Sequence, residues 1–312
     1  TIVKRFDSIG VESTEENRRS YREILFTAPN IEAFISGVIL FDETLRQKTR
    51  DGVPFPDLLS KKGIIPGIKS DRGTTDIPGF PGEKVTEGLD GLRARCNDWR
   101  KLGAGFTKWR AVLQIGDGLP TRFCIDANAR ALARNAALSQ EAGLVAIVEP
   151  EVTMDGPHGI EECEEATECA LKSLYAHLHE QRVVLEGTLL KPNMVLQGRA
   201  CNKQADVQQV AEATLRCFRR SVPAAVPGIV FLSGGQSPIE ATEHLSAMNA
   251  LGGGPWQISF SYGRALQEPV LQAWQGDAAN KESAQKALVH RASLNGAARR
   301  GSYSGDMEAA EA

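Results

Sequence analysis

A single lysine ends an apolar run of the sequence. The run LEGTLLKPNM, residues 185–194, places Lys191 directly before Pro192. Burying an unpaired lysine costs several kcal/mol, which suggests that the amine is needed for chemistry. Proline biases the residue before it to an extended backbone, which aims the Lys191 amine into a cavity. A desolvated amine near other cations has a lowered pKa and is nucleophilic near neutral pH. We therefore predict that Lys191 forms a Schiff base with a carbonyl substrate.

Three further apolar runs carry ionisable side chains at alternate positions, the spacing of residues on one face of a strand. The pairs are Lys69 with Asp71, Lys108 with Arg110, and Glu149 with Glu151. Parity places them on one face of consecutive strands together with Lys191, and the three lysines are expected to lower one another's pKa. The alternative is a set of internal salt bridges. Because burying so many charges is costly, a functional site is the better interpretation.

Two glycine-containing segments, LSGGQS at 232–237 and SYGR at 261–264, each follow a predicted strand. Their glycines let backbone N–H groups approach a phosphate at a helix N-terminus, and the arginine adds a guanidinium. A plain tight turn would also explain SGG, but its pairing with SYGR favours phosphate binding. The predicted phosphate-binding residues are Ser233, Gly234, Gly235, Ser261, Gly263 and Arg264.

The elements that position these residues are short apolar strands separated by amphipathic helices. Seven strand-like runs cover residues 34–41, 64–71, 106–115, 144–151, 183–194, 228–235 and 257–266. Helix-like segments cover residues 14–28, 160–181, 205–222 and 238–251.

Alternating strands and helices predict an α/β fold with a parallel sheet. We expect a TIM (β/α)8 barrel in which seven of the eight strands are readable, as one domain over residues 1–312. Active sites of such barrels lie at the carboxyl ends of the strands, where the charged residues fall. An open doubly wound sheet is the alternative. The polar segment 299–312 is expected to be loose.

Composition excludes several classes of function. A net charge of −3 gives no reason to expect nucleic acid or an anionic membrane as partner. No apolar run reaches the roughly 18–20 residues of a membrane span. Six scattered cysteines suit a reducing compartment. His177 and His179 lie two positions apart in a predicted helix and face different sides, so we predict no metal site and no cofactor.

Several motifs together resemble class I fructose-1,6-bisphosphate aldolase. They are KWR, VEPE, GLDGL, LEGTLLKPN, FLSGGQS and SYGRALQ, and the similarity runs from KRFDSIG to GSYSG. The resemblance implies a metal-free barrel enzyme, usually a homotetramer. It implies reversible cleavage of a small sugar bisphosphate, fructose 1,6-bisphosphate, into dihydroxyacetone phosphate and glyceraldehyde 3-phosphate. The cytoplasm is the expected compartment, with the plastid as the alternative.

The resemblance also assigns roles to individual residues. It implies that Lys191 forms the Schiff base, that Glu149 is the acid/base residue, and that Lys108 lies near the reacting hydroxyls. Lys69 matches another active-site lysine, whereas Arg110 and Glu151 match partners that hold the charges in place. The segments 233–235 and 261–264 match phosphate-binding elements, and Arg5 matches an arginine that contacts the substrate's phosphate.

The resemblance further implies segments that these 312 residues do not contain. Family members have a first barrel strand before KRF, ending in an Asp-Glu-Ser stretch whose aspartate takes part in C–C cleavage. They also have a C-terminal tail that ends in a tyrosine. We therefore expect the native protein to continue at its N-terminus, and we expect a chain without these parts to be a weak or inactive enzyme.

Two other functions are compatible with the sequence. One is a non-catalytic binding or scaffold protein with the aldolase shell, although such a protein has no need to retain Lys191, Glu149 and Lys108. The other is a Schiff-base enzyme for another sugar phosphate. Phosphate-binding regions at opposite ends of the cavity, Arg5 on one side and Ser233 to Arg264 on the other, are expected to favour a bisphosphate.

Overall fold

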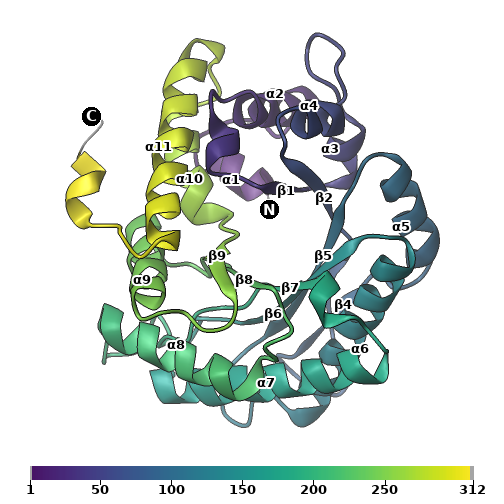
Figure 1. The fold of residues 1–312 in the computed structure, drawn as a ribbon, viewed down its shortest axis with the longest axis vertical. Coiled ribbons are helices and arrows are strands. Elements are labelled where there is room, and N and C mark those ends of the chain that lie inside the picture. Colours follow the sequence, from purple (N-terminus) through teal and green to yellow (C-terminus); the bar gives the residue numbers. More distant parts are fainter. Residues whose placement is uncertain (1, 310–312) are drawn as a thin grey trace.

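One curled sheet of seven parallel strands organises the computed structural model, which describes residues 2–309 (Figure 1). Its strands, in spatial order, are β1 (Gly37–Leu40), β2 (Ile65–Lys69), β5 (Phe106–Leu113), β6 (Val145–Val152), β7 (Thr188–Leu190), β8 (Gly228–Phe231) and β9 (Gln257–Phe260). The seven predicted runs therefore all contain strands. β1 and β9 are the two edges of the sheet.

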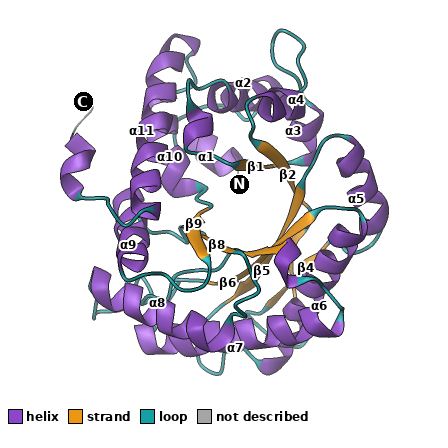
Figure 2. Cartoon of the chain, in the orientation of Figure 1, coloured by secondary structure: helices purple, strands orange, loops and turns teal. Residues whose placement is uncertain are grey.

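Long helices lie outside the curve of the sheet, as Figures 1 and 2 show for α5 to α9. The helices are α1 (Ile2–Asp7), α2 (Glu15–Phe26), α3 (Asp42–Arg46), α4 (Phe55–Lys61), α5 (Leu92–Lys101), α6 (Arg122–Glu141), α7 (Ile160–Glu180), α8 (Val207–Ser221), α9 (Pro238–Ala250), α10 (Arg264–Trp274) and α11 (Lys281–Arg299). The four predicted helices are confirmed as α2, α7, α8 and α9. A short antiparallel hairpin of β3 (Gly73–Asp76) and β4 (Lys84–Glu87) was not predicted.

Side-chain hydrogen bonds cap the N-termini of α2 and α9. The Thr14 hydroxyl accepts a hydrogen bond from the Asn17 N–H at 3.1 Å and caps α2. At α9, the Ser237 hydroxyl accepts from the Glu240 N–H at 3.2 Å, and the Glu240 carboxylate accepts from the Ser237 N–H at 2.8 Å. This reciprocal capping box satisfies two backbone donors that would otherwise have no intrahelical partner.

Strand β7 is shorter than the apolar run that predicted it. Residues Leu185–Gly187 form a 3₁₀ turn, so this part of the predicted run 183–194 is not a strand. The Gln140 side chain explains the difference. Its amide nitrogen donates to the Val184 carbonyl at 2.7 Å, and its oxygen accepts from the Val184 N–H at 3.0 Å. These bonds occupy backbone groups that a longer strand would need.

The register of the central strands brings the predicted ionisable residues together. Lys69 on β2 is opposite Lys108 on β5, and Arg110 on β5 is opposite Glu149 on β6. Strand β6 is buried along seven of its eight residues, as expected for a strand covered on both faces. The carboxyl ends of β5 and β6 therefore hold charged side chains in a protected position.

The two ends of the described chain are both packed. Phe6 of α1 contacts Tyr21 of α2 and Trp274 of α10, with ring centroids 5.6 and 5.5 Å apart. Near the other end, Glu308 forms an ion pair with the buried Arg291 at 2.8 Å and accepts a hydrogen bond from the Tyr303 hydroxyl at 2.6 Å. These contacts tie the segment to α11, but none of residues 299–309 is buried, so the looseness of this segment stays a prediction; residues 310–312 lie outside the described chain.

Candidate active site

Glu149 lies between two lysines inside the barrel. One carboxylate oxygen is 3.1 Å from the Lys191 Nζ atom, and the other is 3.1 Å from the Lys108 Nζ atom. Lys191 is 9% exposed, Lys108 7% and Glu149 3%. The three residues predicted to be catalytic thus come together from β5, β6 and the end of β7, in a place that excludes most water.

Burial and neighbouring charges act differently on the two lysines. Burial lowers the pKa of Lys191, and the charge of Lys108 adds to this effect, whereas Glu149 opposes it. Burial opposes the charge of Lys108 as well, but Glu149 and Asp71 outweigh it and raise the Lys108 pKa overall. The expectation that the lysines lower one another's pKa is therefore wrong for Lys108, because two carboxylates face it. Lys191 is the lysine better suited to act as a neutral nucleophile.

The pKa of Glu149 is lowered. Burial works against its ionisation, but the charges of Lys108 and Lys191 more than compensate. An ionised carboxylate within 3.1 Å of the Lys191 amine is placed to accept and return a proton there.

The remaining predicted charges are paired around this centre. Asp71 forms an ion pair with Lys69 and lies 3.4 Å from the Lys108 Nζ atom. Burial opposes the charge of Asp71, yet Lys108 and Lys69 lower its pKa overall. Arg110 forms an ion pair with Glu151. The alternative of internal salt bridges thus describes these outer pairs well, while Lys191 and Glu149 form the inner pair.

The turn at Ser233–Gly235 adopts a conformation that requires glycine. Gly234 and Gly235 have φ values of 65° and 142°, which other residues rarely adopt. The Ser233 carbonyl accepts from the N–H groups of Gly235 and Gln236 at 2.6 and 2.9 Å. The Arg264 guanidinium donates to the Gly234 carbonyl at 2.7 Å. The segments predicted to bind phosphate are therefore in direct contact.

Arg5 lies beside the SYGR segment. A Cβ atom on Gly263 would be 3.1 Å from the Arg5 Nη2 atom, so glycine leaves room for the guanidinium. Burial lowers the pKa of Arg5, and the charge of Arg264 lowers it further. The Arg5 Nη1 atom donates to Gln267 at 2.8 Å, while its buried Nε atom has no partner in the described chain. The prediction that Arg5 lies across the cavity from Arg264 is wrong, because α1 packs on α10 and places both arginines on one side.

A cavity of about 670 Å³ extends from the lysines to Arg5, and its lining does not include Arg264 or the turn Ser233–Gly235. Lys191, Lys69 and Lys108 line it, together with Arg5 and the segment 260–263. Its volume falls within the usual range for small-molecule sites. Glu149, Arg110 and Glu151 are not part of its lining.

Sequence reasoning missed one residue of this region. Arg199, in the loop after β7, donates from its Nη2 atom to the Gly235 carbonyl at 2.8 Å. No sequence motif predicts this contact, because Arg199 and Gly235 lie 36 positions apart in different loops. An arginine between Gly198 and Ala200 in a loop at the rim of the barrel is the only sequence signal.

The described chain shows neither a metal-binding cluster nor a membrane-spanning helix. Within residues 2–309, no group of three His, Cys, Asp or Glu side chains is arranged to hold a metal ion. Over the same residues, no helix is both long and apolar enough to span a bilayer.

Comparison with known proteins adds to this geometry. A family model described as glycolytic fructose-bisphosphate aldolase class-I matches residues 1–312. The chain belongs to the class I fructose-bisphosphate aldolase family. It is 56% identical over 306 residues to a probable fructose-bisphosphate aldolase class 1 of Xanthomonas campestris, covering 98% of the chain and 92% of that protein. It is 51% identical over 312 residues to the cytosolic fructose-bisphosphate aldolase 4 of Arabidopsis thaliana, covering 100% of the chain and 79% of that protein.

A solved structure of the family has the same fold. It is the fructose-bisphosphate aldolase from Plasmodium falciparum, in a ternary crystal with TRAP and a small-molecule inhibitor. The TM-score is 0.96 at 51% identity, over 98% of this chain and 88% of that one. The predicted α/β barrel with seven readable strands is confirmed, and the open doubly wound sheet is wrong.

Proposed function

We propose that the chain cleaves fructose 1,6-bisphosphate reversibly to dihydroxyacetone phosphate and glyceraldehyde 3-phosphate, through a Schiff base on Lys191. The observation that carries the proposal is the buried Lys191–Glu149 pair at 3.1 Å, with a lowered pKa at Lys191. Membership of the aldolase family supplies the reaction class.

The chemistry follows from these two side chains. The neutral Lys191 amine adds to the substrate carbonyl, whose oxygen leaves as water after Glu149 transfers protons. Glu149 takes the proton of the hydroxyl on the carbon that becomes the aldehyde, the neighbouring C–C bond breaks, and its electron pair passes to the iminium, which gives an enamine and releases the aldehyde. Protonation and hydrolysis of the enamine return Lys191 and the ketone product. Lys108, held by Glu149 and Asp71, presents positive charge to the reacting oxygens.

Phosphate recognition is proposed for the turn at Ser233–Gly235 together with Arg264, Arg5, Ser261 and Gly263. The glycine turn supports it, as do the guanidiniums of Arg264 and Arg5, which form no ion pair with a carboxylate among residues 2–309. Lys69, Arg110 and Glu151 are proposed to hold the surrounding charges. Because Arg5 lies beside Arg264, the preference for a bisphosphate rests on family membership alone. Equal rates with fructose 1-phosphate would favour a different sugar phosphate as the substrate.

Two broader properties are also proposals. A homotetramer follows from the family resemblance and is tested by sedimentation equilibrium. A cytosolic location is supported by the Arabidopsis relative, which is named cytosolic. Subcellular fractionation of the source cells tests this location.

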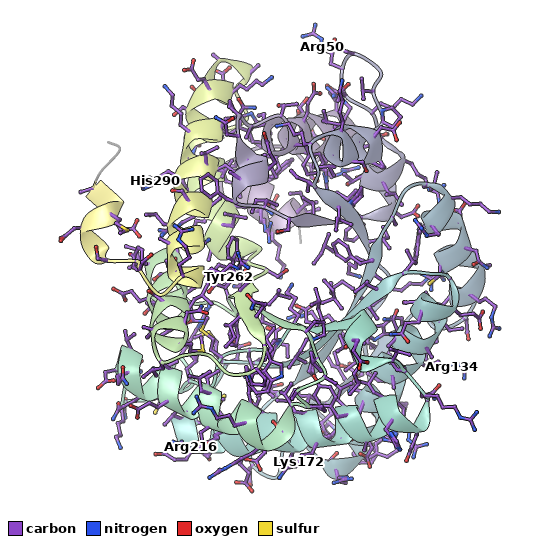
Figure 3. All side chains as sticks on the ribbon, viewed as in Figure 1. Arg50, Arg134, Lys172, Arg216, Tyr262 and His290 are labelled. Carbon is purple, nitrogen blue, oxygen red and sulfur yellow. The ribbon has the colours of Figure 1, made fainter. Side chains whose placement is uncertain are left out.

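Borohydride trapping tests the proposed function directly. The chain is incubated with dihydroxyacetone phosphate, reduced, digested and mapped by mass spectrometry. We expect one adduct, on Lys191, that disappears in Lys191→Arg. Lys172→Arg is the matched control, because Lys172 is exposed on α7 and directed away from the barrel in Figure 3. An intact Lys191 peptide with no adduct in a folded chain would favour the scaffold alternative.

A further inference from the structure

Two arginines hold the neighbouring carbonyls of the glycine turn. Arg264 donates to the Gly234 carbonyl at 2.7 Å, and Arg199 donates to the Gly235 carbonyl at 2.8 Å. Arg199 lies so close that a Cβ atom built on Gly235 would be 1.7 Å from its Nη2 atom. The Arg199 guanidinium therefore occupies the space that a side chain at position 235 would need.

The backbone of Arg199 is held by the loop that follows β6. The Arg199 N–H donates to the Met154 carbonyl at 2.9 Å, and the next residue, Ala200, donates to the Gly156 carbonyl at 3.0 Å. The Gly198 N–H donates to His158 at 2.9 Å, and a Cβ atom on Gly198 would be 2.2 Å from the Gly156 carbonyl oxygen. Backbone hydrogen bonds between the loops after β6 and β7 thus fix the position of Arg199, and its side chain reaches the loop after β8.

The charge of Arg199 has no counter-charge in the described chain. Its one side-chain bond is to an uncharged carbonyl, and Arg264 is in the same situation. Exposed arginines gain little from such a bond and lose side-chain entropy by holding one geometry. Two guanidiniums on neighbouring carbonyls also repel each other. An anion between them would remove that repulsion.

The turn still has a free donor for an anion. The Ser233 carbonyl faces the inside of the turn, where it accepts two hydrogen bonds. In a trans peptide the next N–H, that of Gly234, points the opposite way. Among residues 2–309, this N–H meets no acceptor. Backbone N–H groups of glycine turns with arginines nearby are typical phosphate ligands.

We infer that Arg199 is a positioning residue of the phosphate site, which holds the Gly235 carbonyl by a hydrogen bond and adds a second positive charge at the turn. The inference rests on the phosphate-binding function proposed above for this turn. Arg199 acts on the phosphate of the substrate and not on the reacting carbons, so its loss affects binding more than turnover.

Binding of inorganic phosphate, measured by calorimetry, tests the inference without turnover. Arg199→Met keeps the aliphatic stem and removes the charge, and Arg199→Gln also keeps a donor for the Gly235 carbonyl. Arg134→Met is the matched control, because Arg134 is exposed on α6 and directed away from the barrel (Figure 3). We expect both Arg199 variants to bind phosphate about tenfold more weakly, and Arg134→Met to bind like the parent chain.

Kinetics separate this function from a merely structural one. We expect KM for fructose 1,6-bisphosphate to rise by a similar factor in Arg199→Met, with kcat within about twofold of the parent. Unchanged phosphate binding in both Arg199 variants would overturn the inference, as would a fall in kcat with KM unchanged. If Arg199→Met does not fold, Arg199→Gln gives the same test. A parent chain that binds phosphate through Arg199 but forms no adduct on Lys191 would refute the proposed function and leave this inference standing.

Discussion

Glu149 contacts two lysines that need different protonation states for the proposed reaction. Lys191 must lose its proton to attack, whereas Lys108 keeps a positive charge beside the reacting oxygens. The difference arises from the carboxylates that face each amine. Lys108 has Asp71 and Glu149 as neighbours, at 3.4 and 3.1 Å, while Lys191 forms an ion pair only with Glu149, at 3.1 Å, among residues 2–309. The additional carboxylate, Asp71, thus explains why Lys108 keeps its charge while Lys191 is better able to lose its proton and act as a nucleophile.

Glu149→Gln tests this interpretation at the residue scale. Because Glu149 opposes the lowering of the Lys191 pKa, its removal lowers that pKa further. We expect Lys191 to react with a small amine-labelling reagent at lower pH than in the parent chain. We also expect kcat to fall by roughly 10²–10⁴, the usual loss for a positioned acid/base group.

Glu165→Gln is the control for this experiment, since Glu165 is exposed on α7. It should leave both the labelling profile and kcat unchanged. A Lys191 labelling profile that moves to higher pH in Glu149→Gln would contradict the charge assignment.

At the scale of elements, α9 supports the glycine turn from behind. The ring Nδ1 atom of His244 lies 2.6 Å from the Gln236 amide oxygen, and the Gln236 amide nitrogen donates to the Ser233 carbonyl at 3.1 Å. The first residue of the turn is therefore connected to the helix through two side chains. Burial lowers the pKa of His244 to about 4, so the ring is neutral at neutral pH.

This lowered pKa predicts a pH-dependent stability. An unfolded histidine has a pKa of about 6.5, so below that value the unfolded chain binds a proton that the folded chain refuses. Stability is therefore complete above about pH 6.5 and falls as the pH drops toward 4, by up to about 3 kcal/mol. Urea unfolding of the parent chain and His244→Asn at several pH values measures it. The stability of the parent relative to His244→Asn should therefore decrease as the pH falls from about 6.5 toward 4. A difference that stays constant with pH would argue against a histidine held neutral in the folded chain.

The sequence predicted the elements with strong local signals. The helix predicted over 14–28 is present as α2, and the alternate spacing of Lys108 with Arg110 placed both charges on the correct strand. Contacts between segments far apart in the sequence could not be predicted from it. Gln140 shortens β7 from the neighbouring helix, and Arg199 reaches Gly235 across three loops. Arg5 was placed on the wrong side because the packing of Phe6 on Trp274 has no local signature.

At the scale of the whole molecule, the sheet is unevenly supported. Strands β5 and β6 are paired along eight residues and have neighbours on both sides, whereas β1 and β9 each have one neighbour in the sheet. β1 is also less covered, since only Leu40 of its four residues is buried. Local opening is easiest where few contacts must be broken.

Hydrogen exchange should follow this difference. We expect amides of β5 and β6 to exchange slowest among the strands, at rates set by global unfolding, and amides of β1 and β9 to exchange faster. Mass spectrometry of peptides that separate these strands measures the rates. Equal protection of β1 and β6 would mean that the edges are closed in solution by contacts that residues 2–309 do not show.

The arginines held on carbonyl oxygens have a consequence for how fast substrate arrives. The chain as a whole carries a net charge of −3, so a phosphorylated sugar is weakly repelled at long range. At the glycine turn, Arg199 and Arg264 have no carboxylate partner among residues 2–309, and their field extends about a Debye length, roughly 8 Å, into physiological saline. Encounters with an anionic substrate are therefore favoured on the side of this turn, and the association rate should decrease as salt is added.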